Sequence, residues 1–192
     1  MSIFEELMLA RQISFQDGRV ELTGQRVVIS PSAFFGAYTK SICDSPELVG
    51  AFYRAAKQAM TEGFGKDVGK AYGFSFSNYL DWFVKLAKLS GWGKIEWQES
   101  DEKKHTGIIS AEGSPVAAYL KGKIASPCDH VIRGLMAGGA SSAYKLDLDI
   151  VETECEALGA AKCLFVIDTA ENLRKRHPDL AKLQLGESGA KA

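Results

Sequence analysis

The chain has 192 residues, a formal net charge of −1, 46% hydrophobic and 24% charged residues, and an isoelectric point near 6.3. This composition is typical of one globular domain large enough to bury a core, and it excludes a strongly basic surface for nucleic acids or anionic membranes. No apolar run is long enough to cross a bilayer, and the acidic N-terminus lacks the basic segment that begins a secretion signal. We therefore expect a cytoplasmic protein without a membrane span.

The first 30 residues predict a β lead-in that follows a short helix. Apolar residues at helical spacing over 3–11 indicate the helix. The pair Asp17-Gly18 separates two runs of alternating apolar and polar residues, which is a strong signal for a β-hairpin. A third short strand is expected at 27–29. We expect residues 1–30 to pack on the main domain or to be swapped with it.

Three helices are expected between residues 31 and 90. Proline follows serine at 30–31 and 45–46, and proline suits the first turn of a helix. Helical spacing of apolar residues predicts helices at 31–42, 48–72 and 77–90. Aromatic side chains crowd these helices, where they can form a core, a dimer seam or one wall of an apolar pocket. The five that we predict to bind a ligand in such a pocket are Phe34, Tyr38, Tyr79, Trp82 and Phe83.

After residue 94 the apolar period changes to two, which predicts an antiparallel sheet. The segment 114–122 is expected to be a strand or an excursion at the sheet edge, and 127–144 an inserted helix. Helices followed by strands predict an α+β fold in which an antiparallel sheet packs against a layer of helices. The expected strands of this sheet are 95–100, 105–113, 145–157 and 163–168.

We expect the main domain to span residues 31–170. Residues 171–192 would then form a C-terminal tail. Its helical pattern is interrupted before Pro178, and its last residues are expected to be disordered.

Three of the four cysteines gather near a glutamate in the C-terminal half of the chain. Cys128 precedes the inserted helix, Cys155 and Cys163 flank a seven-residue turn, and Glu152 lies three residues before Cys155. Cysteines in a cytoplasmic protein stay reduced, which leaves core-filling thiols, a reactive thiol or metal ligands. Structural Zn²⁺ prefers thiolates in a set of four donors, so this segment is a candidate zinc site.

The spacing alone leaves the fourth ligand open. In a regular strand, residues three apart point to opposite faces, so Glu152 and Cys155 can share an ion only if the strand is distorted at Thr153–Glu154. If the strand stays regular, His130 is the substitute ligand. Four protein ligands leave no open position for water, so we expect a structural ion and predict no catalytic residues. Cys43 has no histidine at a recognisable spacing and is expected to be an ordinary thiol.

The segment from Cys128 to Ile167 resembles the 4-vinyl reductase domain, and the residues from the lead-in onward look like those of free-standing, archaeal-type members. The residues that carry the resemblance are Gly134, Gly138, Gly139, Glu152, Cys155, Gly159, Cys163 and Phe165. The resemblance implies an α+β fold related to small subunits of the vesicle-tethering (TRAPP) complex, whose members often dimerise through helices. We therefore expect a homodimer.

The resemblance also implies a ligand set for the metal. Sensor members of the family bind zinc through Cys, Glu, Cys and Cys, at spacings like those in this chain. Carried over residue by residue, the ligands are Cys128, Glu152, Cys155 and Cys163, with Zn²⁺ as a structural ion. This favours Glu152 over His130.

Family members serve as aromatic-hydrocarbon sensors in transcription activators or are linked to bacteriochlorophyll vinyl reduction. The resemblance therefore implies a zinc-containing module that binds or senses a hydrophobic or aromatic small molecule. Two alternatives are an accessory that holds a tetrapyrrole for vinyl reduction and a homodimeric scaffold without a diffusible ligand. Phenol-sensing members use a histidine and a tryptophan, but here the helix at 77–90 has no histidine and the strand before Cys128 has no tryptophan. The activators' ATPase and DNA-binding domains are also absent from the chain, which leaves a hydrophobic ligand but argues against phenol.

Overall fold

The computed structural model describes residues 13–22, 24–64 and 76–186, with the backbone alone for Phe64 and residues 76–82. The expected helix at 3–11 and the expected disordered end lie outside these residues. Within the described part, no helix has both the length and the apolar character needed to cross a membrane.

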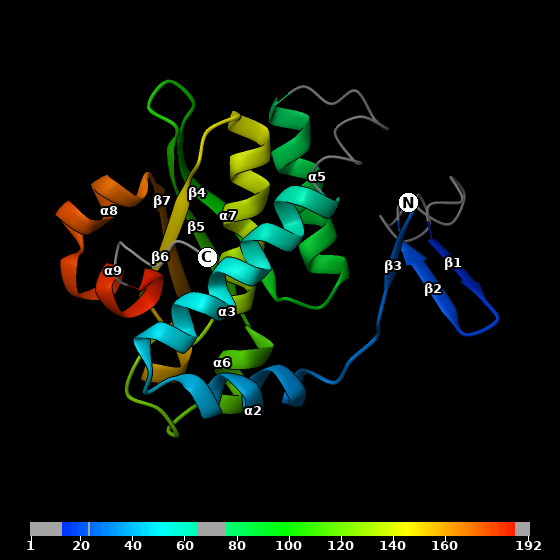
Figure 1. Cartoon of the computed structure of the whole chain (residues 1–192), viewed down its shortest axis with the longest axis horizontal. Coiled ribbons are helices and arrows are strands. Elements are labelled where there is room, and N and C mark those ends of the chain that lie inside the picture. Colours follow the sequence, from blue (N-terminus) through cyan, green and yellow to red (C-terminus); the bar gives the residue numbers. More distant parts are fainter. Residues whose placement is uncertain (1–12, 23, 65–75, 187–192) are drawn as a thin grey trace.

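The lead-in forms a three-stranded antiparallel sheet that lies beside the main body (Figure 1). Its strands are β1 (Ile13–Gln16), β2 (Arg19–Leu22) and β3 (Gln25–Val27). Asp17 and Gly18 both have positive φ angles, 43° and 76°, as a tight hairpin turn requires. The predicted hairpin is therefore confirmed, while the third strand begins two residues earlier than predicted.

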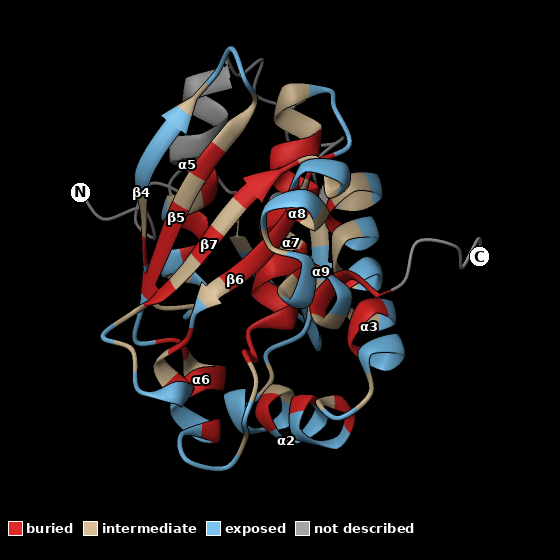
Figure 2. Ribbon diagram, turned by 90° about the vertical axis from the view of Figure 1, so that its left-hand side faces the viewer, coloured by how far each residue is buried: buried red, intermediate tan, exposed pale blue. Residues whose placement is uncertain are grey.

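The main body contains a four-stranded antiparallel sheet with the strand order β4-β5-β7-β6. Figure 2 shows that its buried residues lie mainly on the three strands other than β4. This sheet and its helical layer confirm the predicted α+β class. The strands are β4 (Lys94–Asp101), β5 (Thr106–Glu112), β6 (Asp149–Glu154) and β7 (Cys163–Asp168).

Helices cover one face of the sheet in two layers. Helices α5 (Phe76–Leu89) and α7 (His130–Tyr144) contact the sheet, and α3 (Pro46–Gln58) crosses over α7 (Figure 1). Helix α2 (Ser32–Ile42) packs at one end of the body. The predicted long helix at 48–72 is regular only to Gln58, after which η1 (Ala59–Phe64) is a π-helical turn.

The segment 114–122 is a helix, α6 (Pro115–Leu120), so its prediction as a strand was wrong. The Ser114 hydroxyl accepts a hydrogen bond from the Ala117 amide, and Pro115 occupies the first helical turn. These two residues form a helix start of the same kind as those recognised at 30–31 and 45–46. The cap therefore decided the local structure against the short apolar alternation.

The tail consists of two short helices, α8 (Ala170–Arg176) and α9 (Pro178–Leu185), which confirms the predicted break before Pro178. Helix α9 packs against β6 and α3. The last described element therefore lies against the strand that carries Glu152.

Close packing of α3 on α7 depends on two glycines of α7. A Cβ atom at Gly134 would lie 2.6 Å from the Tyr53 carbonyl oxygen and 2.7 Å from the Ala56 Cβ. A Cβ at Gly138 would lie 2.4 Å from the Lys57 carbonyl oxygen. Both sites meet rigid backbone, so a larger residue would separate the helices.

We expect Gly134→Ala to lower the free energy of unfolding by about 1–3 kcal/mol, the usual cost of overpacking a core. Chemical denaturation measures this change. Gly63→Ala is the matched control, because no atom lies within 4 Å of a Cβ placed there. Equal stability of the two variants would contradict the close-packing argument.

Candidate metal centre and apolar cavity

The fold brings the four predicted metal ligands together. Cys128 lies just before α7, Glu152 is on β6, Cys155 follows that strand and Cys163 begins β7. The donor atoms of Glu152, Cys155 and Cys163 all lie within 4.8 Å of one another, and the Cys128 Sγ lies 3.6 Å from the Cys155 Sγ. All four residues are buried.

A β-bulge places Glu152 beside the thiols. Glu152 pairs with Phe165 and Glu154 pairs with Leu164, so Thr153 is an extra residue on β6. The bulge changes the alternation of side chains between the two faces. This is the distortion that the four-ligand prediction required at Thr153–Glu154.

The turn between β6 and β7 folds Cys163 back toward Cys155. It contains the 3₁₀ turn η2 (Glu156–Leu158) and ends at Gly159, whose φ angle of 98° favours glycine. The amide of Glu156 donates a hydrogen bond to the Cys163 Sγ at 3.3 Å. A backbone amide therefore supports this sulfur in its place.

A ring of hydrogen bonds surrounds the cluster. The Asp129 amide donates to the Glu152 Oε2 at 2.9 Å, and the Ser114 hydroxyl donates to the Asp129 Oδ1 at 2.6 Å. The Glu156 carboxylate accepts from the amides of Gly113 and Ser114, both at 2.9 Å. These bonds join the segments that carry the four ligands to the start of α6.

The electrostatics of the cluster favour a cation. Hydrogen bonds from the thiols of Cys128 and Cys163 lower the pKa of Cys155 to about 2, while those bonds and burial raise the pKa of the two donors. Burial, followed by the charge of Asp129, raises the pKa of Glu152. Among the described residues, no lysine or arginine forms an ion pair with the four ligands. Four acidic groups are therefore buried together without a paired positive side chain.

The donor set and its spacing fit tetrahedral zinc. Ligands bound at about 2.3 Å in a tetrahedron lie about 3.8 Å apart, close to the observed separation of the Cys128 and Cys155 sulfurs. The Glu152 Oε1 is buried and lacks a hydrogen-bond partner. An ion at this position would give that oxygen the partner that a buried polar atom requires.

His130, the alternative ligand, faces a different group. Its Nδ1 lies 3.5 Å from the Arg133 Nη2. Burial and then the charge of Arg133 lower the pKa of His130 to about 3. The described donors that converge are Glu152, Cys155 and Cys163, so the geometry favours Glu152.

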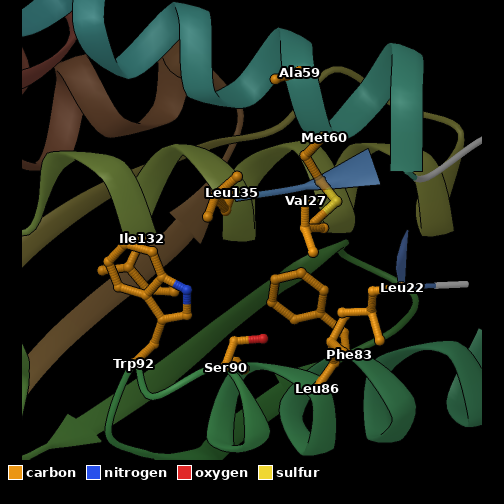
Figure 3. A pocket seen from close by; sticks show the side chains of 11 residues that line it. Leu22, Val27, Ala59, Met60, Phe83, Leu86, Ser90, Trp92, Ile132 and Leu135 are labelled. Atoms are coloured by element: carbon orange, nitrogen blue, oxygen red, sulfur yellow. The ribbon is translucent and has the colours of Figure 1, made fainter. Parts of the chain in front are cut away.

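A separate apolar cavity of about 240 Å³ lies between the lead-in sheet and the helices (Figure 3). Its walls come from β2, β3, η1, α5 and α7. The lining residues are Leu22, Val27, Ala59, Met60, Phe83, Leu86, Ala87, Ser90, Trp92, Ile132 and Leu135. The cavity is therefore mainly hydrophobic, and Ser90 and the indole of Trp92 supply polar groups to its wall.

The predicted ligand-binding residues have different positions. Phe83 lines the cavity. Phe34 and Tyr38 lie on α2, where they are 61% and 44% exposed, and they pack against other aromatic rings. Tyr79 and Trp82 belong to α5, but their side chains are outside the described part.

Sequence reasoning missed most of the cavity wall. The residues of α7 had a signal, because Ile132 and Leu135 belong to its helical apolar pattern. Leu22 and Val27 had none, since nothing local in the lead-in shows which helices it faces.

The sequence of residues 108–169, which includes all four candidate ligands, matches the family model of the 4-vinyl reductase domain. The chain contains a 4-vinyl reductase domain. This confirms the predicted resemblance. No curated protein matches the chain at a significant level.

Among solved structures, this 4-vinyl reductase domain protein is similar to the phenol-responsive sensory domain of the transcription activator PoxR, solved with phenol. The TM-score is 0.75 and the identity 20%, over 97% of this chain and 98% of that one. This similarity extends the shared fold beyond the matched segment to nearly the whole chain.

Two further matches have a TM-score of 0.47. One is a vinyl-4-reductase family protein from Methanocaldococcus jannaschii, with 19% identity over 74% of this chain and 83% of that one. The other is trafficking protein particle complex subunit 3 from Naegleria fowleri, covalently bound to palmitic acid, with 10% identity over 71% of this chain and 91% of that one.

Proposed function

We propose that this protein is a cytoplasmic sensing module that binds a small hydrophobic or aromatic molecule and is stabilised by one structural Zn²⁺. The observation that carries the proposal is the apolar cavity between the lead-in sheet and the helices. The shared fold with a sensory domain supports the same use of the cavity. A reducing compartment would keep the three buried thiols available to the metal.

The metal would have a structural role in this proposal. Cys128, Glu152, Cys155 and Cys163 would supply four protein ligands, which leaves no position for a substrate or an activated water. Bound zinc would join the start of α7 to the β6–β7 hairpin. The same metal would neutralise the acidic groups that are buried together there.

We expect the purified protein to contain one zinc per chain, and Cys155→Ser to lower both the zinc content and the melting temperature. The serine hydroxyl is a poorer zinc ligand than a thiolate, and loss of the ion leaves the buried acids unpaired. Elemental analysis and thermal unfolding measure the two changes. Cys43→Ser is the control, since that thiol lies outside the cluster. Retention of one zinc per chain by Cys155→Ser would contradict the assignment.

The size of the cavity limits the ligand. An engineered cavity of about 150 Å³ binds benzene, so about 240 Å³ suits one or two small fused rings. Ser90 and Trp92 could accept or donate one hydrogen bond to a polar substituent. A four-pyrrole macrocycle is much larger than this space, so the cavity does not favour the tetrapyrrole alternative.

We expect naphthalene and indole to raise the melting temperature, and Leu135→Trp to weaken their binding by about tenfold or more, the factor that 1.4 kcal/mol of lost contact produces. The larger side chain would occupy part of the cavity. Leu48→Trp is the control, because Leu48 lies on the exposed side of α3. Binding is measured by calorimetry. Unchanged affinity in Leu135→Trp, or no binding of either probe by the unmodified protein, would count against this site.

We also propose that the protein is a homodimer in which the lead-in sheets are exchanged. Phe15, Val28 and Ile29 are 58%, 84% and 75% exposed, an unusual exposure for large apolar residues beside a cavity wall. The segment 28–31 is extended and connects the sheet to α2, so it can reach a second copy at low cost.

Light scattering should give the mass of a dimer for the full chain and of a monomer after removal of residues 1–30. The truncated protein would also lose the cavity wall formed by Leu22 and Val27. A monomeric full chain, or a truncated chain that remains a dimer, would contradict the exchange.

A further inference from the structure

The outer edge of β6 is closed by side chains instead of another strand. β6 is the last strand in the described four-stranded sheet, so it presents backbone groups without a neighbouring strand. At Ile150, the amide donates to the Tyr53 hydroxyl at 3.0 Å and the carbonyl accepts from the Arg133 Nη1 at 2.6 Å. Two helices therefore complete this part of the sheet edge.

At Glu152, one side chain from α9 makes both bonds. The Glu152 amide donates to the Gln184 Oε1, and the Gln184 Nε2 donates to the Glu152 carbonyl, both at 2.8 Å. Gln184 is fully buried. Its carboxamide thus reproduces the pair of bonds that a neighbouring strand would form.

The position of this contact matters because β6 becomes irregular immediately after it. Glu152 pairs with Phe165 on one side and with Gln184 on the other, and the bulge at Thr153 follows. A residue next to a bulge has fewer regular ladder bonds to define its backbone. Gln184 supplies that definition at the residue whose carboxylate faces the thiols.

The backbone that carries Gln184 is itself fixed. The Arg133 Nη2 donates to the Gln184 carbonyl at 2.8 Å, and the Arg54 Nη1 donates to the Leu185 carbonyl at 3.1 Å. Positive side chains at the C-terminal end of a helix are favourable to its terminal carbonyls. Helices α3 and α7 therefore hold the end of α9, and α9 holds Glu152.

We propose that Gln184 is a positioning residue for the metal ligand Glu152, an inference that rests on the proposed zinc site. Gln184 fixes the Glu152 peptide, and the Asp129 amide holds the Glu152 Oε2, so the Oε1 is directed to the metal. Coupling between two sites is reciprocal, so bound zinc also strengthens the docking of α9. The C-terminal helix thereby responds to occupancy of the metal site.

The test is the zinc affinity of Gln184→Ala, measured by competition with a chromophoric chelator. We expect a loss of about 10- to 100-fold, as for other residues that orient metal ligands. Leu185→Ala is the matched control, because it removes buried packing from the same helix and leaves the Gln184 amide in place. Gln184→Met, which keeps the side-chain volume but not the hydrogen bonds, decides the matter if the alanine variant does not fold.

Two further readouts separate positioning from general stability. Co²⁺ in place of zinc should show altered visible absorption bands in Gln184→Met and unaltered bands in Leu185→Ala, because the bands report the ligand geometry. Zinc should slow hydrogen exchange of the α9 amides in the unmodified protein. Equal zinc affinity and equal cobalt spectra in the Gln184 and Leu185 variants would overturn the inference. Absence of zinc binding by the unmodified protein would instead overturn the proposed function.

Discussion

Burial of a carboxylate among three thiols is the constraint on which the account of this protein depends. Glu152, Cys128, Cys155 and Cys163 are inaccessible to water, and in the described structure no basic side chain pairs with them. Ionised groups in such a place require a counter-charge. A divalent ion supplies it and at the same time explains the bulge in β6, the tight turn before β7 and the position of the residue before α7.

Helix α7 connects the candidate metal centre to the cavity. Cys128 lies just before this helix, Arg133 binds the β6 edge, and Ile132 and Leu135 face the apolar space. The glycines on its other side let α3 approach closely, which brings η1 to the cavity wall. A change at either site is therefore transmitted to the other through one tightly packed helix.

Much of this arrangement could be predicted from local sequence patterns. Asp17-Gly18 specifies its hairpin by turn chemistry, and the four-ligand hypothesis required the distortion that β6 has at Thr153. The strand predicted at 114–122 failed because the Ser114 cap outweighed alternation. Gln184 had no local signal, since its partner Glu152 is 32 positions away in the chain and the contact exists only after α9 docks. The cavity was hidden for the same reason, because Val27 and Leu135 meet only in the folded chain.

X-ray absorption at the zinc edge tests the central claim most directly, because it reports the atoms bound to the ion. The account predicts three sulfur ligands at about 2.3 Å and one oxygen at about 2.0–2.2 Å. A zinc ion surrounded only by nitrogen and oxygen, or a protein purified from zinc-containing medium without bound zinc, would contradict it.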